Sequence, residues 1–200
     1  MNLVCLDLEG VLVPEIWIAF SQAAGIPELN RTTSDEPDYD KLMDFRLDLL
    51  KKNNLKLSDI QNVISGMEPL AGAVEFTRAL RERTQLVILS DTFEQFAKPL
   101  MAKLSWPTLL CNRLQTAADG AVCGYSLRQR NGKQEAVKAF KSLNLRVFAS
   151  GDSYNDLAMI READCGCLFR APEQIRKDCA DIHCVDTFDD LLSEILEFFD

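Results

Sequence analysis

Apolar residues along this chain fall into two alternating patterns, short continuous runs and longer segments with helical spacing. Continuous runs near residues 3–6, 85–90 and 146–150 are typical of strands buried on both faces of a parallel sheet. The alternation with helical segments predicts an α/β fold with a doubly wound, mostly parallel sheet. The helices expected in this core lie at about 72–83, 93–104, 132–143 and 154–163, with one more near the C-terminus.

A hairpin is expected within the otherwise parallel pattern. An apolar run at 107–114 is followed by a turn at 117–120 and by a second run at 121–127. The short connection predicts an antiparallel return. Two further short strands are expected at 165–169 and near 182–186.

The segment between the first two core strands is too long for a single crossover helix. Residues 14–66 contain three stretches with helical spacing, the first of which ends at Gly25. We therefore predict a core domain formed by 1–13 and 69–200, with a helical cap domain at 14–68 inserted in it. An insertion rooted beside a site can exclude water and contribute substrate contacts.

Composition and charge argue against several kinds of partner and site. The formal net charge of −9 argues against nucleic acid and anionic membrane surfaces as partners. No apolar run approaches the roughly 18 residues of a membrane span, and the N-terminus begins with a strand and not with a signal segment. The seven cysteines form no CxxC pair and His183 is the only histidine, so a zinc site is not expected. We expect a cytoplasmic protein with reduced cysteines.

Polar side chains end three of the apolar runs, where a core strand would not carry them. They are Asp7 and Glu9 after the first run, Ser90, Asp91 and Thr92 after the second, and Asp152 and Asp156 after the third. Ligands of parallel α/β sheets bind beyond the carboxyl ends of the strands, so these groups should converge. Carboxylates gathered at one sheet edge are costly to bury and imply a cation or a proton.

Each of these motifs also has a purely structural interpretation. Asp7 and Glu9 suit a nucleophile and a proton carrier, but they would also suit a solvated strand end. Asp152 and Asp156 offer hard oxygen ligands for Mg²⁺, but the alternative is that Asp152 or Ser153 caps the helix that follows. Ser90 could contact a phosphate or cap a helix, and a lysine such as Lys133 is usually a solvated surface charge.

Taken together, the motifs resemble the haloacid dehalogenase superfamily of aspartyl phosphotransferases. The order is an acid pair after the first strand, a hydroxyl after the next, Lys133, and the segment Gly-Asp-Ser-Tyr-Asn-Asp at 151–156. Helices inserted after the first motif resemble the branch that contains phosphoserine phosphatases. Glu9 and Val11 stand where the superfamily usually has Asp and Thr, as in members of this branch that also transfer phosphate to homoserine.

The resemblance implies roles in the reaction for several residues. Asp7 would be the nucleophile that forms an aspartyl phosphate, and Glu9 the general acid and base. Mg²⁺ would be held by Asp7, the backbone carbonyl of Glu9 and Asp152, with Asp156 supporting the site. The implied substrates are O-phosphoserine and, as a phosphate acceptor, homoserine.

The resemblance also implies which residues bind the substrate. Ser90, Lys133 and Asn155 would hold the phosphate oxygens, with the backbone at Asp91 alongside. Glu15 and Arg46 match positions in the inserted helices that grip an amino acid, through its ammonium and its carboxylate.

Two other functions fit part of the pattern. A signalling receiver domain also combines strand-end acids, a hydroxyl and a lysine around Mg²⁺, but it needs no helical insertion over its acceptor. A phosphatase of the same superfamily for another small phosphomonoester would differ mainly in the inserted helices. The sequence leaves open whether the chain forms a homodimer and whether it serves serine or threonine synthesis.

Overall fold

The centre of the protein is a seven-stranded sheet with the order β4-β3-β2-β1-β5-β6-β7. The computed structural model describes residues 1–33, 35–36 and 38–200. Neighbouring strands are parallel except for β3 and β4, which form the predicted antiparallel hairpin. The predicted doubly wound α/β fold is therefore confirmed. The strands are β1 (Asn2–Leu6), β2 (Gln85–Phe93), β3 (Thr108–Thr116), β4 (Val122–Ser126), β5 (Arg146–Gly151), β6 (Cys165–Phe169) and β7 (Cys184–Val185).

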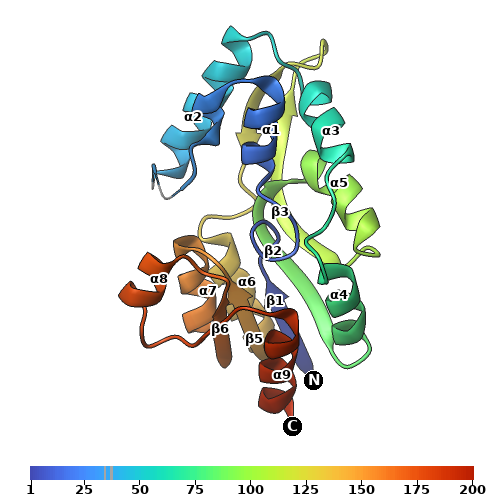
Figure 1. Cartoon of the computed structure of the whole chain (residues 1–200), viewed down its shortest axis with the longest axis vertical. Coiled ribbons are helices and arrows are strands. Elements are labelled where there is room, and N and C mark those ends of the chain that lie inside the picture. Colours follow the sequence, from blue (N-terminus) through green and yellow to red (C-terminus); the bar gives the residue numbers. More distant parts are fainter. Residues whose placement is uncertain (34, 37) are drawn as a thin grey trace.

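Strand β1 lies in the middle of the sheet and divides the core into two layers. Its side chains alternate, with Val4 and Leu6 packed on one face and Leu3 and Cys5 on the other. Helices α4, α5 and α9 cover the first face, and α6, α7 and α8 cover the second (Figure 1). These helices are α4 (Ala73–Arg81), α5 (Glu94–Lys103), α6 (Gly132–Ser142), α7 (Leu157–Glu162), α8 (Glu173–Asp178) and α9 (Phe188–Phe199).

The segment between β1 and β2 is helical, as predicted. It contains α1 (Ile16–Ala24), the 3-10 turn η1 (Pro27–Asn30), α2 (Tyr39–Lys52) and α3 (Leu57–Ser65). Figure 1 shows the N-terminus at the lower end of β1, so the carboxyl end of this strand points toward α1 and α2. The inserted helices therefore lie above the sheet edge where the polar motifs were expected to meet.

The hairpin of β3 and β4 links the inserted helices to the sheet. Its tip reaches the start of α3, where the Leu57 N–H donates to the Gly120 carbonyl over 3.0 Å. At the same tip, the Lys56 ammonium group donates to the backbone carbonyl of Asp119 at 2.8 Å. Figure 1 shows the hairpin running up beside these helices. The helical segment is thus attached to the core at the hairpin as well as at its two ends.

Three elements differ from the sequence prediction. Strand β2 continues to Phe93, so Ser90 and Asp91 lie within it, and its pairing with β3 is irregular between Leu89 and Phe93. The expected helix at 154–163 divides into a 3-10 turn, η2 (Tyr154–Asp156), and α7. Helix α8 was not predicted because its six residues are too few to show an apolar period.

No helix in the described part of the chain is both long enough and apolar enough to cross a membrane.

Candidate active site

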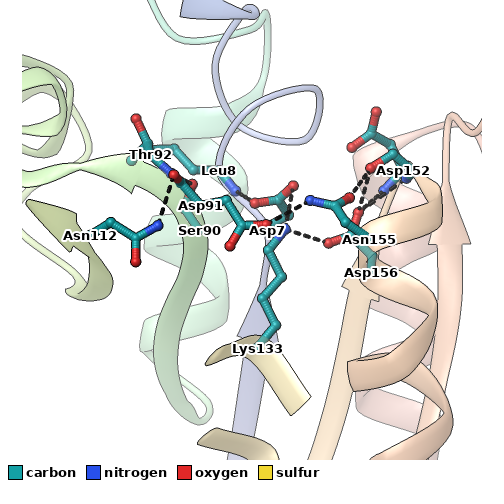
Figure 2. Close-up of polar contacts among 11 residues, drawn as sticks. Asp7, Leu8, Ser90, Asp91, Thr92, Asn112, Lys133, Asp152, Asn155 and Asp156 are labelled. Atoms are coloured by element: carbon teal, nitrogen blue, oxygen red, sulfur yellow. Dashed lines mark hydrogen bonds and ion pairs between the residues drawn. The ribbon is translucent and has the colours of Figure 1, made fainter. Parts of the chain in front are cut away.

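The polar motifs meet at the carboxyl ends of β1, β2 and β5 (Figure 2). Asp7 directly follows β1, and its N–H donates to the carbonyl of Ser150 in β5 over 3.1 Å. The Asp7 side chain is only 7% exposed, and one of its oxygens accepts from the Leu8 N–H at 2.7 Å. The parallel register of the sheet therefore places a fixed carboxylate at the centre of the site.

Lys133 joins two buried carboxylates. It is the second residue of α6, and its ammonium nitrogen lies 3.0 Å from Asp7 Oδ2 and 2.6 Å from Asp156 Oδ1. All three side chains are buried. Burial alone would lower the pKa of Lys133, but the carboxylates of Asp156 and Asp7 raise it well above its usual value. Lys133 is therefore a buried cation, which differs from the surface lysine that its residue type alone would suggest.

Asp156 is held in place by the turn that carries it. Its Oδ2 accepts hydrogen bonds from the N–H groups of Asp152 at 3.1 Å and Ser153 at 3.0 Å. Ser153 also caps the turn reciprocally with Asp156. The capping interpretation of this motif is thus correct for Ser153 and wrong for Asp152, and the reciprocal partner of the cap is Asp156.

The acidic cluster has the charge and the donor atoms for a divalent cation. One oxygen each from Asp7, Asp152 and Asp156 lies within 4.8 Å of the others, and Lys133 supplies the only positive charge in contact with them in the described structure. Burial and the Asp156 carboxylate raise the pKa of Asp152 to about 7, and the same two causes raise that of Asp7. A bound cation would oppose both shifts.

Two local features show that Asp152 is available as a ligand. Its Oδ1 is buried and has no hydrogen-bond partner in the structure. Gly10 (φ +78°) passes close by, and a Cβ at that position would lie 2.4 Å from Asp152 Oδ2. Only glycine leaves room for the carboxylate there. Carboxylate oxygens are the ligands of hard cations such as Mg²⁺, so the residues fit such an ion.

Asp91 accepts hydrogen bonds from three parts of the fold, including Asn155, which was expected to bind phosphate. Its carboxylate accepts from Asn155 Nδ2 at 2.9 Å. Its backbone carbonyl accepts from Asn112 Nδ2 and from the Tyr39 hydroxyl, each at 3.1 Å. Since Tyr39 begins α2, one residue of β2 links the inserted helices, the hairpin strand β3 and the turn after β5. Figure 2 shows the contacts of Asp91 with Asn112 and Asn155.

Arg46 from the inserted helices and Glu9 from the loop after β1 lie in the same site. Arg46 is 7% exposed, its guanidinium lies 4.5 Å from the centre of the Trp17 ring, and burial lowers its pKa to about 10. Burial and the Glu15 carboxylate raise the pKa of Glu9 to about 7. Glu9 Oε2 accepts from the N–H of Ile16, the first residue of α1, at 2.9 Å. Glu9 therefore reaches from the β1 loop toward the helical segment.

A cavity of about 250 Å³ brings these groups together. Asp156 lies behind its wall, in contact with Lys133, and the other nine sequence-predicted residues line it. Thr92 also lines the cavity, as expected of a polar residue at this strand end, although the resemblance implied no role for it. Trp17 and Tyr39 line the cavity too and were not expected there, because their positions are typical of the apolar side of a helix. The nine lining residues are Asp7, Glu9, Glu15, Arg46, Ser90, Asp91, Lys133, Asp152 and Asn155.

Similarity to known proteins extends over nearly the whole chain. Residues 1–164 match the family described as haloacid dehalogenase-like hydrolase. Phosphoserine phosphatase ThrH of Pseudomonas aeruginosa is 54% identical over 197 residues, which cover 98% of this chain and 96% of that protein. A phosphoserine phosphatase of Pseudomonas syringae pv. tomato is also 54% identical over 197 residues, with 98% and 83% covered.

Solved structures show the same fold. A substrate-bound phosphoserine phosphatase complex superimposes with a TM-score of 0.79 at 23% identity, covering 98% of this chain and 97% of the other. A structure described as a phospho-aspartyl intermediate analogue of phosphoserine phosphatase gives a TM-score of 0.79 at 25% identity, with 98% of both chains covered.

Replacing Lys133 by Met tests whether its charge holds the buried acids together. Without it, Asp7 and Asp156 would share a buried site with no cation, so in EDTA at neutral pH the free energy of unfolding should fall by about 3–5 kcal/mol. The pKa of Asp7 would rise further above its unfolded value, so the folded variant would bind protons more tightly than the unfolded chain. The deficit relative to wild type should therefore shrink as the pH is lowered toward about 5.

Lys138→Met is the matched control, since Lys138 is exposed on the same helix and pairs only with Glu135 at 2.7 Å. Its effect should stay within about 0.5 kcal/mol. Urea unfolding measured at several pH values checks both variants. Equal losses in the two variants, or a Lys133→Met deficit that does not change with pH, would contradict this assignment.

Proposed function

The chain belongs to the haloacid dehalogenase-like hydrolase family, and from this premise we propose that it is a phosphoserine phosphatase that forms an aspartyl phosphate on Asp7. The observation that carries the proposal is the buried Asp7 carboxylate, fixed beside Lys133 at the base of a cavity that the inserted helices close. The two relatives that are 54% identical across 98% of the chain and are named phosphoserine phosphatases support the choice of substrate.

The reaction follows from the positions of Asp7 and Glu9. A carboxylate oxygen of Asp7 attacks phosphorus, the bond between phosphorus and the ester oxygen breaks, and Glu9 gives a proton to the departing serine oxygen. Glu9 then takes a proton from water, which attacks the aspartyl phosphate and releases inorganic phosphate and the Asp7 carboxylate. A pKa of about 7 allows Glu9 to give and take this proton at neutral pH.

The groups around Asp7 would bind the phosphoryl group. Lys133 neutralises charge from one side, while the Ser90 hydroxyl and the Asn155 amide donate hydrogen bonds to the oxygens. The Thr92 N–H donates to Ser90 Oγ at 3.2 Å, which leaves the Ser90 proton free for the phosphate. Fixed donors of this kind supply most of the rate enhancement in phosphoryl transfer.

A Mg²⁺ site is part of the proposal. Asp7, Asp152 and the backbone carbonyl of Glu9 would hold the ion, and Asp156 would support it through the N–H groups that it orders. When bound, Mg²⁺ would neutralise charge that develops on the phosphoryl oxygens. The buried Asp152 Oδ1, which has no partner among the described residues, is the main support for this assignment.

We also propose that 14–68 acts as a cap domain that selects the amino acid. Arg46 lies on the cavity wall with a buried Nε that has no hydrogen-bond partner among the described residues. A planar guanidinium group can bind the substrate carboxylate, and Glu15 can pair with its ammonium group. A cavity lined by charged side chains of the inserted helices favours turnover of a small molecule over the receiver function, in which the phospho-Asp must remain available to a protein partner.

Transfer of phosphate from phosphoserine to homoserine is a second proposed activity. Its support is the position of Glu9, which lines the cavity together with Glu15 and Arg46, the residues proposed to bind an amino acid. The ThrH relative, at 54% identity, supports the same activity. Homoserine would attack the aspartyl phosphate in place of water, with its proton passing to Glu9.

Asp7→Asn tests the nucleophile. Because Asn cannot form the acyl phosphate, phosphoserine hydrolysis in the presence of Mg²⁺ should fall by at least about 10³-fold. Phosphate release from purified protein measures the loss. Asp181→Asn, which changes an exposed acid paired with Arg161, should retain wild-type activity. An active Asp7→Asn variant would refute the nucleophile assignment.

Asp152→Asn tests the cation site by a readout that does not depend on activity. Removing one charged ligand should weaken Mg²⁺ binding by about tenfold or more in calorimetry. The Mg²⁺-dependent rise in thermal stability should decrease accordingly. Asp181→Asn again serves as the control. An affinity equal to that of the wild type would exclude Asp152 as a ligand.

Homoserine transfer is tested by following the products with ³¹P nuclear magnetic resonance. Adding homoserine during phosphoserine turnover should yield phosphohomoserine at the expense of inorganic phosphate, because both acceptors draw on one intermediate. Release of inorganic phosphate alone, at saturating homoserine, would restrict the activity to hydrolysis.

A further inference from the structure

Three buried side-chain polar atoms in the described part of the protein have no hydrogen-bond partner, namely Arg46 Nε, Thr92 Oγ1 and Asp152 Oδ1. All three residues line the active-site cavity. Buried polar groups are nearly always hydrogen-bonded, so three exceptions around one cavity indicate groups that await a ligand. Under the proposed function, Asp152 is satisfied by the cation and Arg46 by the substrate carboxylate. Thr92 has no role in that scheme.

The fold places Thr92 in the cavity wall through an irregularity in β2. Regular pairing with β3 stops at Leu89 and resumes at Phe93, which lies opposite Asn112. The residues between them all line the cavity, and Thr92 is 5% exposed. Irregularities of this kind re-aim side chains and are common beside active sites. Figure 2 shows Thr92 beside Asp91 at this end of the strand.

The surroundings of Thr92 show which part of a substrate it would meet. Thr92 and Glu9 line the same cavity. Burial raises the pKa of Glu9 most, and the Thr92 side chain lowers it, so the two groups are neighbours, although Thr92 Oγ1 has no hydrogen-bond partner among the described residues. Lys133, which would face the phosphoryl group, has its charged neighbours in Asp156, Asp7 and Asp91. Thr92 therefore stands on the proton-transfer side of the cavity.

We propose, on the basis of the proposed function, that the Thr92 hydroxyl donates a hydrogen bond to the reacting oxygen of the alcohol. That oxygen is the ester oxygen of phosphoserine in the first half-reaction and the homoserine hydroxyl in phosphate transfer. Glu9 exchanges the proton of this oxygen, while Thr92 binds one of its lone pairs and forms no bond to phosphorus. Thr92 thus helps to orient the alcohol and stabilises the negative charge that develops as the ester bond breaks.

The test compares Thr92→Val, which keeps the shape of the side chain, with Thr92→Ser, which keeps the hydroxyl. It uses two esters, because a serine oxygen leaves poorly and depends on hydrogen bonding, whereas the nitrophenolate of p-nitrophenyl phosphate leaves readily without it. For Thr92→Val, kcat with phosphoserine should fall about tenfold, the equivalent of one hydrogen bond. Its kcat with p-nitrophenyl phosphate should stay close to wild type, and Thr92→Ser should restore turnover of phosphoserine.

Thr77→Val is the structural control, since Thr77 is equally buried but bonds to the Val74 carbonyl at 3.0 Å within α4. It should leave the ratio of the two activities unchanged. Equal losses of Thr92→Val on both esters, or no loss on either, would overturn the assignment. Turnover of p-nitrophenyl phosphate but not of phosphoserine by the wild type would instead reject the proposed function. In that case Thr92→Val and Thr92→Ser would be compared on glycerol phosphate in place of phosphoserine, because its alkyl oxygen also leaves poorly. The same outcomes would support or overturn the role of Thr92.

Discussion

The structure of the site depends on one buried ammonium group. Lys133 lies between Asp7 and Asp156, at 3.0 and 2.6 Å, and it is the only cation in contact with the acidic cluster in the described structure. Three carboxylates against one lysine leave the cluster short of positive charge. Burial and that imbalance together raise the pKa values of Asp7 and Asp152, and a divalent cation would relieve the imbalance. The charges that the fold gathers around Lys133 therefore favour the binding of the cation that the proposed reaction uses.

The fold meets this constraint by fixing two of the three acids, Asp7 and Asp156, to backbone N–H groups. Asp7 is held at the end of β1 by Leu8 and by the neighbouring strand β5, and Asp156 is held by the turn after β5. Side chains on three separate parallel strands can be placed this accurately only because the register of the sheet is fixed by burial on both faces. The backbone carbonyl of Asp91 accepts a hydrogen bond from the Tyr39 hydroxyl, which connects the site to the inserted helices.

Much of this arrangement could be predicted from the sequence, because strand-end acids in a parallel sheet must converge at one edge. The ten predicted site residues lie together, and the helices between β1 and β2 were expected. The sequence could not show that β2 runs on to Phe93, because its last residues are polar and pair through an irregularity. Trp17 and Tyr39 were not expected in the site for a related reason, since residue type does not reveal which way a side chain points. The division into domains, a homodimer and a cytoplasmic location stay predictions.

The most direct test of the account is to locate the covalent phosphate during turnover. The enzyme would be mixed with phosphoserine and Mg²⁺ and quenched in acid, and the acyl phosphate would be reduced with borohydride before peptide mass spectrometry. We predict that the modification lies on Asp7 alone and that it appears only when substrate is present. A modification on any other residue, or none in a sample that is demonstrably turning over substrate, would contradict the central claim.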